Sequence, residues 1–241
     1  MIELIAALAL LLSKWTDFAV ALALLVVNAI LSYQRVLTWI INKLSRTILK
    51  SGFVVIAFLA TGKFVISALG MVLLVFMTDF VKIALATDRV RPSQTPESWN
   101  IGPLVRVGAL LGMLMLLEAL ALLAFAWGRL GSSDGQMQTF SFQTLLFFAL
   151  FSLVSIRERR AFWSSRPSLT LSIALLADAC AGILIGIIGL GEMRPVPFTV
   201  TALIVTYTFV CGLLANEAIK VALIGGKGAA RSIGNSAPTS A

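Results

Sequence analysis

The sequence contains no histidine and little charge. Of its 241 residues, 12% are Asp, Glu, Lys or Arg, whereas 59% are hydrophobic. Soluble domains carry about twice that share of charged residues, so the composition excludes an ordinary soluble protein or soluble enzyme. The absence of histidine excludes histidine-based catalysis, imidazole metal ligation and histidine proton relays. Two cysteines, Cys180 and Cys211, both lie in apolar runs and indicate neither a disulfide framework nor a metal site.

Long apolar runs fill most of the sequence and predict an all-α, polytopic transmembrane bundle of about eight helices. Helices are favoured because the strands of a membrane barrel would alternate apolar and polar residues. The first run would be about 18 Å long as a helix, too short to cross about 30 Å of hydrocarbon, so we expect a first helix that lacks its N-terminal half. The runs are 2–12, 18–31, 51–61 (preceded by a basic amphipathic stretch, 34–50), 64–86, 104–127, 140–156, 169–190 and 198–224.

Basic residues gather in every second connection between these runs. The alternate connections carry only one basic residue each. By the positive-inside rule, the basic connections and both termini are predicted to lie in the cytoplasm. The net charge of +8 then indicates an interaction with anionic lipid and not with nucleic acid. The basic sets are Arg35, Lys43, Arg46 and Lys50; Arg89, Arg91 and Arg106; Arg157, Arg159, Arg160 and Arg166; and Lys220, Lys227 and Arg231.

Asp79 is a lone carboxylate in the apolar run 64–86. An ionisable side chain at membrane depth is costly and is usually kept for moving an ion or proton. Lys82, three residues further on, lies on roughly the same helix face. It is either a countercharge for Asp79 or a side chain that snorkels towards the membrane boundary.

Three other carboxylates lie in apolar runs, and each is expected to have a structural role. That role is a hydrogen bond to a neighbouring helix or an interfacial ion pair, such as one between Glu217 and Lys220. Glycines spaced four apart, at 108 and 112 and at 182 and 186, predict close packing between helices. The three carboxylates are Glu118, Asp178 and Glu217.

Several segments carry a pattern more specific than apolar composition: FMTDFVKIALATDRVRPS at 76–93 with PESW at 96–99, QRVLTWIINK at 34–43, RERRAFWSSRPS at 157–168, and WTDF and LVVNA at 15–18 and 25–29. The first resembles the sixth membrane helix and following loop of P-type ATPases, in particular their plasma-membrane proton-efflux branch. The others resemble the same family's stalk into the fifth helix, its loop between helices eight and nine, and its first helix hairpin.

This resemblance implies a division of the chain and a place in the cell. Residues 1–33 would be the first transmembrane hairpin, and 34–224 would hold helices five to ten of the family. The resemblance does not cover 225–241, whose Gly, Ser and Ala content predicts a disordered cytoplasmic tail. The resemblance also implies a multi-pass protein of the plasma (inner) membrane.

The resemblance further implies a proton site. In the family, an aspartate of the sixth helix carries the proton and an asparagine of the second helix is its partner. By motif these roles fall on Asp79 and Asn28. A carboxyl in hydrocarbon can hold a proton because burial disfavours its ionised form, and an amide can donate to the ionised form or accept from the neutral one.

The family's catalytic parts are missing from the sequence. Tyr33 runs directly into Gln34, where the actuator domain, helices three and four, and the phosphorylation and nucleotide domains would stand. Neither the Asp-Lys-Thr-Gly-Thr phosphorylation motif nor the Gly-Asp-Gly-x-Asn-Asp magnesium motif occurs, nor does a Walker loop. We therefore expect no catalytic residue, no resident metal and no ATP hydrolysis by this chain alone; ATP and Mg²⁺ are cofactors of the full-length family.

Four functions stay open at this point. The first is a membrane-domain remnant of a proton-exporting P-type ATPase, with its proton site at Asp79 and Asn28. The second is a passive proton or cation conductor, or a membrane subunit that works with a separate catalytic chain. The third is an incomplete sequence of an active ATP-driven pump, and the fourth is a structural membrane protein unrelated to pumps. The expected partners are the lipid bilayer and protons or a small cation, and not nucleic acid.

Overall fold

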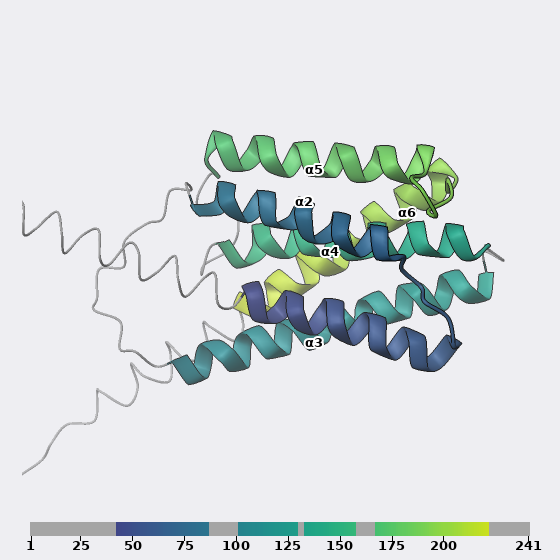
Figure 1. Cartoon of the computed structure of the whole chain (residues 1–241). Helices are drawn as coiled ribbons and strands as arrows, with labels where there is room; N and C mark the ends of the chain where they lie inside the picture. Colours follow the sequence, from purple (N-terminus) through teal and green to yellow (C-terminus); the bar gives the residue numbers. More distant parts are fainter. Residues whose placement is uncertain (1–41, 87–100, 130–132, 158–166, 222–241) are drawn as a thin grey trace, which may run out of the picture. The chain divides into compact units, whose positions relative to one another are not determined.

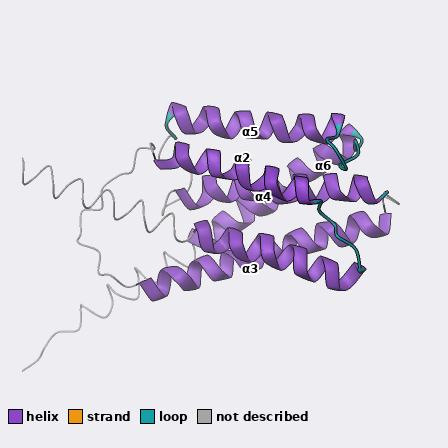
Figure 2. Ribbon diagram, in the orientation of Figure 1, coloured by secondary structure: helices purple, strands orange, loops and turns teal. Residues whose placement is uncertain are grey.

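The computed structural model describes residues 42–86, 101–129, 133–157 and 167–221, and these residues form helices joined by short loops (Figures 1 and 2). No strand occurs among the described residues; a single bridge pairs Leu190 with Met193. The helices are Asn42–Thr61, α2 (Ala68–Ala86), α3 (Ile101–Arg129), α4 (Asp134–Arg157), α5 (Leu169–Ile188) and α6 (Phe198–Thr208), which continues as the π-helix η2 (Phe209–Ala215).

Six helices in the described part are long and apolar enough to cross a membrane, with α6 and η2 belonging to one span, Phe198–Val221. This confirms the prediction of an all-α membrane helix bundle. The runs 2–12 and 18–31 and the tail 225–241 lie outside the described residues. The count of about eight therefore remains approximate, and the three-part division of the chain stays a prediction.

Two helices begin where a serine caps them. α2 begins at Ala68, later than the predicted start at Phe64, because the Ser67 hydroxyl accepts the backbone N–H of Gly70 at 3.0 Å. Ser168 likewise accepts the backbone N–H of Leu171 at 3.3 Å in the first turn of α5.

α4 begins earlier than predicted, at Asp134 and not at residue 140. The residues from 134 to 139 are mostly polar, and their composition suggested a loop. They are helical, and Asp134 in the first turn places a negative charge at the positive end of the helix dipole.

α4 is the central helix of the bundle. Of its membrane span, 83% is buried, compared with 28% to 44% for the other five described spans. It contacts α2, α3, α5, α6 and η2 (Figure 1). Because protein rather than lipid surrounds it, α4 can carry a set of buried polar side chains: Thr139, Ser141, Gln143, Thr144, Ser152 and Ser155.

Glycines allow two of the helix pairs to approach closely, as their spacing predicted. A Cβ atom added at Gly112 of α3 would lie 2.9 Å from the Ser45 Cα atom of the Asn42–Thr61 helix. At the same contact the Ser45 hydroxyl donates to the Gly108 carbonyl at 2.8 Å. Gly182 and Gly186 of α5 pack in the same way against α4.

Replacing Gly112 with alanine is expected to destabilise the bundle by about 1–3 kcal/mol, the usual cost of overpacking. The new methyl group would meet Ser45 backbone atoms, which cannot rotate away as a side chain can. The measurement is the free energy of unfolding in detergent, by titration with SDS. Gly128→Ala on the same helix is the control, because nothing lies within 4 Å of its added Cβ. Equal stability of the two variants would contradict the prediction.

Candidate functional site

Asp79 lies on the outer side of α2 and is paired with Lys82. The Lys82 ammonium donates to Asp79 Oδ1, within one turn of the same helix. The Asp79 side chain is 54% exposed and that of Lys82 is 18% exposed. Of the two roles predicted for Lys82, this contact is the one expected of a countercharge.

Lys50 reaches the same region from the neighbouring Asn42–Thr61 helix. Its ammonium donates to the hydroxyl of Thr78 at 3.1 Å, and that hydroxyl donates to the Leu74 carbonyl at 2.8 Å. Thr78 is the residue before Asp79, and Lys50 lies close enough to Asp79 and Lys82 to interact electrostatically with both. A second lysine is therefore held beside the carboxylate by a threonine hydroxyl.

Arg46 brings a third cationic group into the interior. Its side chain is buried, and Nη2 donates to the Ala149 carbonyl of α4. Nε and Nη1 have no hydrogen-bond partner among the described residues, and neither does Oδ2 of the buried Asp178 on α5. Asp178 and Asp79 both interact electrostatically with Arg46. The guanidinium thus interacts electrostatically with carboxylates from two different helices.

The sequence grouped Arg46 and Lys50 with the basic residues of a cytoplasmic connection. Both residues belong to the Asn42–Thr61 helix and lie in its second and third turns. Residues 34–50 were predicted to be a basic amphipathic stretch that leads into the next apolar run, and the described helix begins within this stretch, at Asn42. Two of its basic residues extend into the bundle and interact with carboxylates of α2 and α5.

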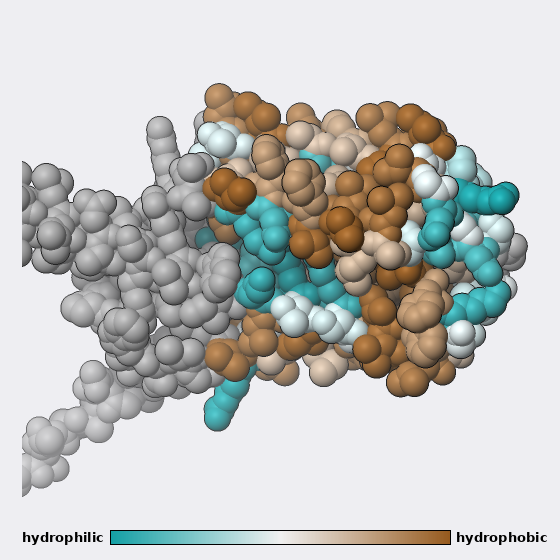
Figure 3. Space-filling view, viewed as in Figure 1, coloured by the Kyte–Doolittle hydropathy of each residue, from teal (hydrophilic) through white to brown (hydrophobic). Residues whose placement is uncertain are grey.

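We refer to these side chains as the polar cluster: Arg46, Lys50, Thr78, Asp79, Lys82 and Asp178. Figure 3 shows hydrophilic surface between apolar surfaces, over α2 and the Asn42–Thr61 helix. Exposed apolar side chains such as Phe76 and Ile83 lie on the same helix as Asp79. Charged groups within an apolar span usually line an ion or proton path.

The predicted partner Asn28 lies outside the described residues. Its pairing with Asp79, and the role of both residues in binding a proton, stay predictions.

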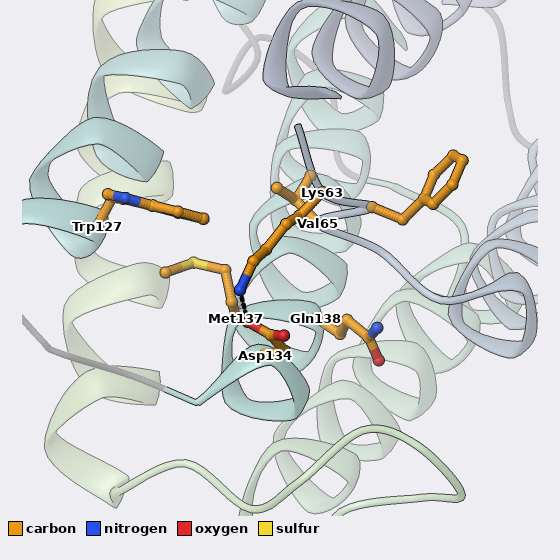
Figure 4. Close-up of a pocket in the computed structure, with 7 residues that line it drawn as sticks. Lys63, Val65, Trp127, Asp134, Met137 and Gln138 are labelled. Carbon is orange, nitrogen blue, oxygen red and sulfur yellow. Dashed lines mark hydrogen bonds and ion pairs between the residues drawn. The ribbon is translucent and has the colours of Figure 1, made fainter. Parts of the chain in front are cut away.

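A second charged feature lies where the Asn42–Thr61 helix ends and α4 begins. Lys63 donates to Asp134 at 2.8 Å across an open pocket, which Trp127, Val65 and Met137 help to line (Figure 4). The two side chains are 56% and 73% exposed. An exposed ion pair contributes little to stability and little to binding selectivity, so this pocket is not our candidate site.

The remaining intramembrane carboxylates take the structural contacts that were predicted for them. Glu118 accepts a hydrogen bond from Asn216 at 3.0 Å, which joins α3 to the segment after η2. Glu217 pairs with Lys220 at 2.8 Å. Both of these side chains are only 3% exposed, so the pair is buried against neighbouring helices.

The chain is distantly similar to a protein of Methanocaldococcus jannaschii named "Putative cation-transporting ATPase". The two are 24% identical over 193 residues, which are 80% of this chain and 24% of the relative. The chain thus spans about a quarter of the length of that protein. No family model matches the chain. This similarity supports distant kinship with that protein.

Proposed function

We propose that this chain is the membrane-domain remnant of a proton-exporting P-type ATPase, with Asp79 as its proton-exchanging group. The observation that carries the proposal is the Asp79–Lys82 pair inside an apolar helix, beside Lys50 of a second helix. The resemblance of residues 76–93 to the sixth helix of proton pumps assigns the same role to Asp79. Asn28 is proposed as its amide partner.

The contacts within the polar cluster favour a proton over a metal cation. The cluster contains three cationic side chains, those of Arg46, Lys50 and Lys82, and two carboxylates, those of Asp79 and Asp178. A metal cation would need several oxygen ligands, whereas the two ammonium groups already bind Asp79 Oδ1 and the Thr78 hydroxyl. A proton requires only one carboxylate oxygen, and a carboxylate that gains it releases its neighbouring ammonium group. Proton exchange can therefore switch the Asp79–Lys82 ion pair.

We propose that this activity is independent of ATP. The phosphorylation and magnesium motifs of the family do not occur in the sequence, so hydrolysis would require a separate catalytic chain. The proposed setting is the plasma (inner) membrane, with both termini in the cytoplasm. In the described part, the Asn42–Thr61 helix and α3 begin, and α4 and the last span end, at the same end of the bundle (Figure 1). Lys43, Arg106, Arg157 and Lys220 belong to the turns near those helix ends, which supports that orientation.

Proteoliposomes that contain the purified chain provide the test. Under an imposed pH gradient, we expect an internal pH-sensitive dye to report proton entry without ATP, and we expect Asp79→Asn to abolish it. Asp134→Asn is the matched control, because it removes the same charge from an exposed ion pair at the other end of the helices.

Two results would contradict the proposal. Equal proton entry for the parent chain and Asp79→Asn would show that the path does not use this carboxylate. No entry above that of empty liposomes would show that Asp79 has no access to both sides in this chain. Entry of Na⁺ or K⁺ in place of protons would support the alternative of a passive cation conductor.

A further inference from the structure

The carboxyl of Glu118 is in contact with the amide of Asn216. Neither residue belongs to the polar cluster. Glu118 lies near the middle of the membrane span Val105–Gly128 of α3. Its Oε2 accepts from the Asn216 amide at 3.0 Å, and its backbone carbonyl accepts from the hydroxyl of Tyr207 at 3.1 Å. α3 is thus joined through one residue to two positions of the last span.

The π-helix η2 makes this double contact geometrically feasible. Tyr207 and Asn216 are nine residues apart, and an unbroken α-helix would turn about 900° between them and place them on opposite faces. A π-helix absorbs one extra residue, which reduces the turn to about 800° and places both side chains towards one side. The backbone N–H of Asn216 bonds to the carbonyl of Cys211, five residues earlier, as a π-helix requires. π-Helices occur frequently at functional sites.

Only one of the two polar atoms of the Asn216 amide, Nδ2, forms a hydrogen bond in the described part. The residue is 3% exposed, and its Oδ1 has no hydrogen-bond partner among the described residues. Nδ2 of the same amide bonds to Glu118, and Oδ1 is attached to the same carbon atom as Nδ2, so the Glu118 carboxyl is a group that Oδ1 can reach by a small rotation of the amide. A buried polar atom without a partner costs about 1–3 kcal/mol, so a group that can donate to this oxygen is expected.

Only the protonated form of Glu118 matches both atoms of the amide. An ionised carboxylate accepts hydrogen bonds and has none to donate, whereas a protonated carboxyl has one donor and one acceptor. The acid O–H can donate to Oδ1 while the other carboxyl oxygen accepts from Nδ2. The match does not depend on which atom of the amide is assigned as nitrogen, because an ionised carboxylate can satisfy only one of them in either orientation.

We propose that Glu118 and Asn216 form a second proton-binding site, in which the Glu118 carboxyl carries a proton and shares two hydrogen bonds with the amide. In the described part, Glu118 forms no ion pair with Lys or Arg. The titratable groups that interact with it there are Tyr207 and Cys211, from α6 and η2. Neither is cationic, so neither can replace the proton as a countercharge.

Infrared spectroscopy of the full chain in lipid vesicles at neutral pH tests the site. We expect the C=O stretching band of a protonated carboxyl, and we expect Glu118→Gln to remove it. Asn216→Ala should retain the band but shift it to higher frequency, because the acid loses two hydrogen bonds. Glu192→Gln, at an exposed position between α5 and α6, is the matched control and should leave the band unchanged.

The glutamine variant can still accept a hydrogen bond from Asn216, and its unfolding midpoint in detergent would establish that it folds. A band that survives Glu118→Gln, or no band in the parent chain, would overturn the proposal. So would loss of the band on addition of Na⁺ or K⁺, because the ligand would then be a metal cation. Asp79→Asn should leave the band in place, so a failure here is distinguishable from a failure of the proposed transport function.

Discussion

Replacing Lys220 with methionine is expected to destabilise the bundle by about 3–5 kcal/mol, the cost of leaving a buried charge without its partner. Glu217 and Lys220 are both 3% exposed and pair at 2.8 Å. Ser155 of α4 completes the group, since its hydroxyl donates to Glu217 and its carbonyl accepts from Lys220, each at 2.5 Å. Without the ammonium, the Glu217 carboxylate would stay buried and lose the countercharge of Lys220. The measurement is the free energy of unfolding in detergent.

Two comparisons isolate the role of burial in that prediction. Lys63→Met breaks an ion pair of the same length whose side chains are 56% and 73% exposed, and it should cost less than about 1 kcal/mol. The double variant Glu217→Gln and Lys220→Met removes both charges, so it should recover much of the stability lost by Lys220→Met alone. A loss as small as that of Lys63→Met would contradict a buried pair at this position.

Replacing Gly186 with alanine is expected to cost about 2–4 kcal/mol, because it displaces a side chain that links three helices. The added Cβ atom would overlap the amide of Gln143, a fully buried residue of α4. That amide donates to the Gly182 carbonyl of α5 at 3.0 Å and accepts from the hydroxyl of Thr201 of α6 at 3.2 Å. If Gln143 moves, both partners lose a buried hydrogen bond.

A double-mutant cycle separates this overlap from other effects of the new methyl group. In a Gln143→Ala background the obstructing amide is absent, so Gly186→Ala should cost little more. Cys180→Ala is a control on an exposed position of α5. If Gly186→Ala costs the same with and without Gln143, the loss does not arise from the amide, and the proposed link is wrong. Unfolding in SDS measures all four stabilities of the cycle.

Much of the helical fold was readable because apolar runs of sufficient length have few alternatives in a membrane. The residues at which helices begin were harder to predict. Ser67 caps α2, so this helix begins later than its apolar run. The polar residues from 134 to 139 are helical despite their composition. The central position of α4 could not be predicted, because burial against protein leaves no periodic apolar face to detect.

The candidate site was only partly predictable. Asp79 and Lys82 were found because a helix places residues three apart on one face. Arg46 and Asp178 are 132 residues apart, and nothing in either local sequence indicates that they interact. Lys50 was predicted only as one of the basic residues of a connection, because its register against Asp79 depends on how two helices pack. Such interhelical registers come from tertiary structure and not from local pattern.

The polar character of α4 also bears on how the chain enters a membrane. Its span has a mean hydropathy of 1.5, whereas α3 and α5 each reach 2.3. Insertion of a lone segment depends on the apolar surface it offers to lipid, and Gln143 or Ser155 finds partners only once neighbouring helices are in place. α4 is therefore expected to leave the translocon together with other helices of the bundle. The order of synthesis, with α3 before it and α5 after it, supplies those helices on both sides.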